Sequence, residues 1–148
     1  CLSATGIYDY VIILRDNDSA HRMTVNMESS LTDWLSANLK KNDLLLTPEY
    51  TMNEVTMSGA AVLRMALFMH GLQGYDTSYR AGQAVLMYTT DDPEVLKAAV
   101  KQEKITYILF EEDMEFEQQE CREETIAAAY EKVYETQDGR IRIYKTTE

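Results

Sequence analysis

The residue types best suited to ligand chemistry gather in one short segment, residues 70–82, which reads HGLQGYDTSYRAG. Within it lie Tyr75, Asp76, Tyr79 and Arg80. Asp76 and Arg80 offer a hydrogen-bond acceptor and a donor for a polar ligand, and Tyr75 offers an aromatic surface for stacking. Sugars suit this mixture of groups, so the segment is a candidate ligand-binding loop.

The same segment has a structural interpretation. Gly71 and Gly74 permit the positive φ that often ends a helix. Asp76 or Thr77 would then cap the next helix, and Arg80 would pair with Asp76 at i, i+4 spacing. On spacing alone this structural interpretation is favoured.

Other catalytic and cofactor signatures are missing from the sequence. No G-x-G-x-x-G, P-loop or G-x-S-x-G pattern occurs. His21 and His70 have no neighbouring motif for a zinc site or a triad, and the acidic neighbours of Cys121 would raise its thiol pKa. The sequence therefore predicts no catalytic residue, no cofactor and no metal site.

The charge of the chain is strongly acidic, with a net charge of -11 and a pI near 4.6. This excludes the basic footprint of a nucleic-acid-binding protein and argues against attraction to anionic lipid surfaces. Residues 111–124 (EEDMEFEQQECREE) hold much of the negative charge, with Arg122 as their one basic residue. They lack the D-x-[DN]-x-[DN]-G calcium pattern, which favours a solvated acidic loop over a metal site.

The length of 148 residues and a hydrophobic content of 45% predict a single globular domain over residues 1–148. The sequence begins with Cys1 and not Met, which indicates a fragment of a longer chain or a processed product. No apolar run reaches the about 18 residues of a membrane span. Whether Cys1 and Cys121 form a disulfide stays open.

Several segments have the pattern of regular structure. Apolar runs predict buried strands at residues 8–14, 44–47 and 105–110. Residues 21–28 are expected to form an edge strand or a loop. An alternating segment at residues 140–145 predicts an edge strand after a QDG turn. Helical stripes occur at residues 30–41, 62–67, 78–88, 93–103 and near 126–133. The last of these helices could yield to a strand at residues 133–136. Ser30 and Asp92 are the expected caps of two of these helices.

This alternation of strands and helices predicts an α/β fold. The expected architecture is a single layered domain with a mainly parallel sheet, flanked by helices and closed by an antiparallel C-terminal edge strand.

The order of several segments resembles a known group of proteins. The segments are LSATGIYDYVI, LTDWLSANLKKNDLLLT, SGAAV, GLQGYDTSYRAG, DDPEVLKAAVKQEKITYILFEE and IRIYK. In this order they resemble the soluble C-terminal domain of bacterial polytopic membrane proteins of the GT-C glycosyltransferase type. The matching positions are Gly6, Asp9, Trp34, Asn38, Gly74, Tyr75, Asp76 and Arg80. The sequence departs from the group at Leu39, where Thr is common, and in the Met-rich residues 65–69.

The resemblance implies a membrane-attached domain on the extracytoplasmic side. Its partners would be the transmembrane region of the same polypeptide and a lipid-linked sugar or polar glycan. The group's catalytic carboxylate lies in an early loop between transmembrane helices, and no residue here matches it, so this domain would not be catalytic alone.

By the same resemblance, the candidate ligand-binding residues are Asp9, Tyr75, Asp76 and Arg80. Gly6, Trp34, Asn38 and Gly74 would be structural. The resemblance supports the ligand-binding interpretation of Asp76 and Arg80 as strongly as spacing supports the structural one.

Two other functions fit parts of the sequence. Cys1 could carry acyl chains, which would make the chain a lipid-anchored extracytoplasmic protein that binds a small ligand. A soluble enzyme with a nucleotide or sugar substrate at the carboxyl ends of its strands is a third interpretation, and the missing phosphate-binding loop counts against it.

Overall fold

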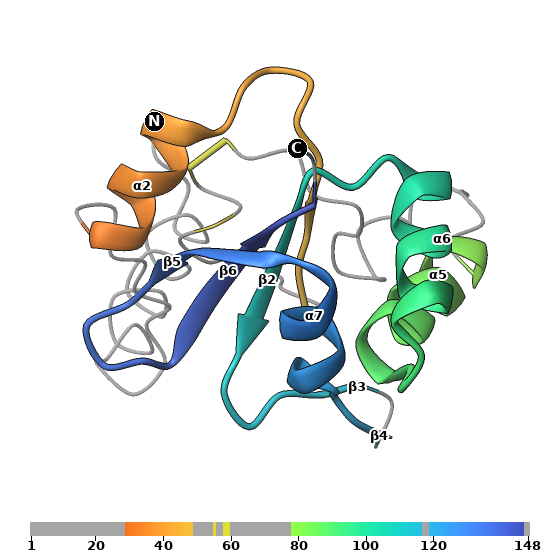
Figure 1. The fold of residues 1–148 in the computed structure, drawn as a ribbon. Coiled ribbons are helices and arrows are strands. Elements are labelled where there is room, and N and C mark those ends of the chain that lie inside the picture. The colour runs from red at the N-terminus through yellow and green to blue at the C-terminus, as the bar shows by residue number, and fades with distance from the viewer. Residues whose placement is uncertain (1–28, 49–54, 56–57, 60–77, 117–118, 147–148) are drawn as a thin grey trace, which may run out of the picture.

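The computed structural model describes residues 29–48, 55, 58–59, 78–116 and 119–146 (Figure 1). Its helices are α2 (Ser30–Asn38), α5 (Ser78–Thr89), α6 (Pro93–Glu103) and α7 (Glu123–Ala129). The strands are β1 (Leu45–Leu46), β2 (Tyr107–Glu111), β3 (Glu115–Phe116), β4 (Gln119–Glu120), β5 (Glu131–Glu135) and β6 (Ile141–Lys145). Strands at residues 8–14 and 21–28 and a helix at 62–67 are expectations that lie outside these residues.

The main sheet has four strands in the order β1-β2-β6-β5. Among the strands of the described residues, only β1 and β2 pair in parallel, whereas β6 is antiparallel to both β2 and β5. The expectation of a mainly parallel sheet is not confirmed in the described residues. The expected edge position of the C-terminal strand is wrong, because the turn after β5 folds β6 back between β5 and β2.

The side chains of the sheet pack on both of its faces. Ile108 and Phe110 of β2 join a hydrophobic cluster with α5, α6 and α7, whereas Tyr107 and Leu109 join a second cluster with α2. Figure 1 shows α2 apart from α5, α6 and α7, with the sheet between them. This alternation is the period of two expected when both faces of a strand are covered. The described part of the chain is therefore a helix–sheet–helix sandwich.

The helix boundaries follow local capping chemistry. The side chain of Ser29, not Ser30, caps α2 by accepting a hydrogen bond of 3.2 Å from the Thr32 N–H. Asp92 caps α6 as expected, accepting from the Glu94 N–H at 2.8 Å, and Pro93 begins that helix. Lys104 ends α6 in the left-handed region, with φ of 57°. This turn sends the chain directly into the central strand β2.

Strands β5 and β6 form a hairpin around the predicted turn. Gly139 has φ of 72°, a conformation that other residues adopt only with strain, and its N–H donates to the Thr136 carbonyl at 2.9 Å. The sequence allowed a change from helix to strand at residues 133–136, and the structure places the strand β5 at residues 131–135. No helix within the described residues is long and apolar enough to cross a bilayer.

Candidate ligand-binding site

The structure describes three of the eight residues singled out by the resemblance. Gly6, Asp9, Gly74, Tyr75 and Asp76 lie outside the described residues. Arg80 lies in the first turn of α5, and its side chain is exposed. Whether Arg80 and Asp76 act together on a ligand therefore stays a prediction.

Trp34 and Asn38 lie on α2, where Trp34 packs against the second hydrophobic cluster and Asn38 is exposed. The Trp34 ring packs edge-on against Tyr107, with ring centroids 5.8 Å apart, and at 5.2 Å from the Tyr134 ring. The side-chain amide of Asn38 donates to the Trp34 carbonyl at 2.8 Å. The Trp34 ring contacts pack α2 against the sheet, whereas the Asn38 hydrogen bond lies within α2 itself. A structural role for Asn38 stays a prediction.

A polar hollow of about 440 Å³ opens where the β5–β6 hairpin meets the start of α2 and the end of β2. Its polar lining consists of Ser30, Glu111, Thr136, Gln137, Asp138 and Arg140. These residues are separated by up to about a hundred positions in the sequence, and the fold of β2, β5 and β6 brings them together. Of the features that form this hollow, the sequence predicted only the QDG turn at residues 137–139.

Hydrogen bonds within the hairpin preorganise part of the hollow. The Thr136 hydroxyl donates to an Asp138 carboxylate oxygen at 2.6 Å, and the Arg140 N–H donates to the same oxygen at 3.2 Å. The hydrogen bond from Thr136, followed by that from Arg140, lowers the pKa of Asp138. Asp138 is therefore ionised at neutral pH and fixed in position.

The Arg140 guanidinium remains available to a ligand. Its Nη2 lies 3.9 Å from Glu111 Oε1, and the Arg140 side chain is 63% exposed. A loose pair at that exposure contributes little to stability. Hydroxyl, amide, carboxylate and guanidinium groups around one hollow match the hydrogen-bonding needs of a polyhydroxylated ligand.

The described acidic residues make no metal centre. No group of three potential ligands among the His, Cys, Asp and Glu residues of the described ranges is placed to hold an ion. Cys121 is buried in the hydrophobic cluster of α5, α6 and α7. Its pairing with Cys1 lies outside the described residues, as do His21 and His70.

A partly buried ionic cluster ties α7 to the sheet. The Tyr144 hydroxyl donates to Glu123 Oε1 at 2.6 Å, and Arg142 Nε lies 3.1 Å from the same oxygen. The Arg142 guanidinium also lies over the Phe110 ring, 5.6 Å from its centroid. Arg142 Nε is buried and its angle to Glu123 is too poor for a hydrogen bond, so the contact is an ion pair alone. The cluster has no nucleophile, and its contacts stabilise the packing of α7 against the sheet.

Alkaline pH should weaken this tie. Burial, and next the hydrogen bond to Glu123, raise the pKa of Tyr144 well above its usual range. The folded state therefore favours the neutral phenol. This stabilisation is complete below about pH 10, the pKa of an unfolded tyrosine, and is lost as pH rises further, because the unfolded chain ionises first. We expect the free energy of unfolding, measured in urea, to fall above about pH 10.

The variant Tyr144→Phe isolates this effect. Above about pH 10, the free energy of unfolding of this variant should fall less steeply with pH than that of the wild type, by up to about 1.4 kcal/mol per pH unit. Some slope should remain, because burial also raises the pKa values of Tyr107 and Tyr130. An alkaline slope that is unchanged in Tyr144→Phe would contradict the assignment.

Comparison with solved structures finds a similar fold. The described architecture resembles the C-terminal globular domain of an oligosaccharyltransferase from Archaeoglobus fulgidus, known from a crystal structure. The match has a TM-score of 0.51 and covers 85% of this chain and 99% of that chain, at 12% sequence identity. At this identity the likeness shows the fold alone. No protein-family model matches the sequence, and no curated protein does.

Proposed function

We propose that this chain is a non-catalytic, ligand-positioning domain of a membrane glycosyltransferase-like protein that acts on lipid-linked sugars. The observation that carries the proposal is the fold shared with the globular domain of an oligosaccharyltransferase over 85% of the chain. The order of sequence segments independently resembles the C-terminal domains of bacterial GT-C-type proteins.

In this proposal the parent protein is polytopic and the domain lies on the extracytoplasmic side of the membrane. Catalysis belongs to the membrane region of the same polypeptide. The domain contributes hydrogen bonds that orient a glycan. The polar hollow beside Arg140 is one contact surface, and Asp9, Tyr75, Asp76 and Arg80 are the further ligand-binding residues that the resemblance suggests.

The first test is the coding sequence upstream of Cys1. Several apolar spans of about 20 residues each would support the proposal. A short soluble reading frame would overturn it. A single signal peptide, together with acyl chains on Cys1 in mass spectrometry of the native protein, would instead establish the lipid-anchored ligand-binding protein.

The second test is kinetic and uses the full-length membrane protein. Arg140→Ala removes a charged donor from the polar hollow, and such hydrogen bonds contribute about 1.5–3 kcal/mol. If the interaction is equal in the ground and transition states, KM for the glycan substrate should rise about 10-fold or more while kcat stays unchanged.

Arg122→Ala is the matched control. Arg122 is 46% exposed and has a loose ion pair of 3.6 Å to Glu124, outside the polar hollow. Its KM should remain at the wild-type value. An unchanged KM in Arg140→Ala would remove this hollow from the proposed function without affecting the test on the coding sequence.

A further inference from the structure

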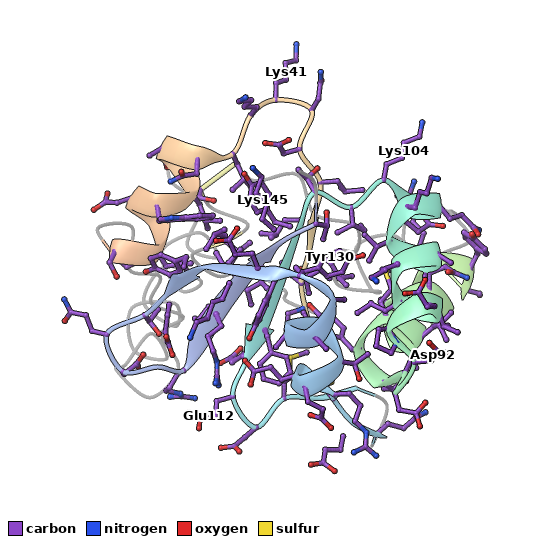
Figure 2. The ribbon with its side chains drawn as sticks, in the orientation of Figure 1. Lys41, Asp92, Lys104, Glu112, Tyr130 and Lys145 are labelled. Atoms are coloured by element: carbon purple, nitrogen blue, oxygen red, sulfur yellow. The ribbon has the colours of Figure 1, made fainter. Side chains whose placement is uncertain are left out.

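The fold gathers several lysines of this acidic chain at one end of the sheet, where Asp43, Glu103 and Glu131 also lie. Lys104 follows α6 and precedes β2, and Lys40 and Lys41 precede β1, which is parallel to β2. Lys145 lies opposite Tyr107 in the antiparallel β2–β6 pair, at the same end of the sheet. Figure 2 shows Lys41, Lys104 and Lys145 at this end, and Asp92 and Glu112 at the other. We call the first the lysine-rich end.

A hollow of about 450 Å³ lies at the lysine-rich end, beside the last turns of α6. Lys97, Lys101 and Lys104 line it. Lys97 and Lys101 lie four residues apart on one face of α6, and Lys104 follows the last residue of that helix. Val100, Ile105 and Tyr130 provide an apolar part of its lining. Cationic groups therefore surround a surface that is largely apolar.

The lysines are only partly neutralised. Lys97 has an ion pair of 2.8 Å with Glu94, whose side chain is 79% exposed. Lys101 and Lys104 have no salt-bridge partner among the described residues. The helix dipole explains a preference for lysine at the end of α6. Lys145 lies directly opposite Glu131 in the β5–β6 pair, which favours a lysine there. Neither effect explains the apolar hollow beside Lys97, Lys101 and Lys104.

We propose that the lysine-rich end is a docking surface for the anionic phospholipid headgroups of a membrane. Ammonium groups would meet the phosphates, while the half-buried Tyr130 ring and the lysine methylenes would contact the interfacial region. A tyrosine suits that position because its ring is apolar and its hydroxyl is polar. This inference does not depend on the proposed glycosyltransferase function.

The net charge of -11 does not forbid this contact. Asp92 and Lys104 are the residues just before and just after α6, and a helical rise of 1.5 Å per residue separates them by about 18 Å. The Debye length at physiological salt is only about 8 Å. A surface touching the lysine-rich end is thus largely screened from the acidic end, so the distribution of charge, rather than its sum, decides binding.

The test is co-sedimentation of the chain with phosphatidylcholine vesicles, prepared with and without phosphatidylglycerol, at about 0.15 M salt. We expect binding only to the vesicles that contain phosphatidylglycerol. The double variant Lys101→Glu/Lys104→Glu should bind about 25-fold more weakly or worse, since each surface lysine contributes roughly a fivefold factor. These side chains are exposed, and unchanged melting temperatures will confirm folding.

The matched control is Arg122→Glu/Arg140→Glu, which changes the net charge by the same amount at the acidic end. It should retain vesicle affinity to within about threefold. An equal loss in both double variants would overturn the proposal, because net charge would then explain binding. Equal binding to both vesicle types, no binding to either, or full displacement by inorganic phosphate alone would also overturn it.

Discussion

Replacing Ile108 with alanine is expected to lower the free energy of unfolding by about 2–5 kcal/mol. Ile108 is fully buried on β2, an interior strand of the sheet, where it pairs with Tyr144 of β6 and with Leu46 of β1. Its side chain belongs to the cluster that joins the sheet to α5, α6 and α7. The truncation leaves a cavity that a strand held on both sides cannot close.

Val95→Ala is the control for this prediction. Val95 lies on α6 and is 39% exposed. A truncation there should cost less than about 1 kcal/mol, because little apolar area returns to water and alanine favours a helix. Urea unfolding should show a lower midpoint for Ile108→Ala at an unchanged m-value. Equal losses in the two variants would mean that the face of the sheet next to α5, α6 and α7 is not the main core.

Local patterns in the sequence predicted α2, α6 and the buried strand β2 well, whereas the predicted last helix extended past Ala129, where α7 ends, into β5. The stripe of Leu31 and Leu35 predicted α2, and the Asp92–Pro93 pair predicted the start of α6, because caps and helical periodicity depend on neighbouring residues. The apolar run at residues 105–110 likewise predicted β2, at 107–111 in the structure. These features need no knowledge of the partner element.

The sheet topology could not be predicted from such patterns. The alternation in residues 140–145 suggests a strand with one solvated face, and that suggested an edge. In the structure, β6 is interior because it pairs with β5 on one side and with β2 on the other. Ile141 and Ile143 face the cluster next to α2, whereas Arg142 faces the opposite side of the sheet. Alternation reports which faces are buried, whereas strand order depends on pairing between distant residues.

The polar hollow beside Arg140 could not be predicted from the sequence for the same reason. Ser30, Glu111 and Arg140 come from three separate elements, and no spacing relates them. The lysine-rich end combines Lys41, Lys104 and Lys145 in the same way, although the overall composition only showed an acidic chain. A net charge cannot reveal how a fold distributes its charged side chains.

Replacing Glu123 with alanine is expected to destabilise the fold by about 2–3 kcal/mol. One oxygen of Glu123 serves both Tyr144, whose residue is 3% exposed, and Arg142, whose side chain is 19% exposed. Its removal leaves the buried Tyr144 hydroxyl without its acceptor, which costs about 1–3 kcal/mol, and leaves the largely buried Arg142 guanidinium without its ion-pair partner. Thermal or urea unfolding at neutral pH measures the loss.

Glu124→Ala is a close control because both glutamates lie in the first turn of α7 and interact alike with the helix dipole. Glu124 is 73% exposed and lies 3.6 Å from Arg122, so its loss should cost under about 1 kcal/mol. Similar losses in the two variants would mean that the dipole, not the ionic cluster, is the cause.

Glu123→Gln separates charge from hydrogen bonding, since the amide oxygen still accepts from Tyr144 but no longer neutralises Arg142. We expect a loss of stability smaller than that of the alanine variant.

The contacts of Glu123 also bear on the lysine-rich end. Helix α7 begins at Glu123, and its C-cap Tyr130 lines the hollow at the lysine-rich end. If the ionic cluster holds α7 in place, Glu123→Ala should also weaken binding to phosphatidylglycerol vesicles, although it removes a negative charge. A gain in vesicle affinity would show instead that net charge outweighs the position of α7.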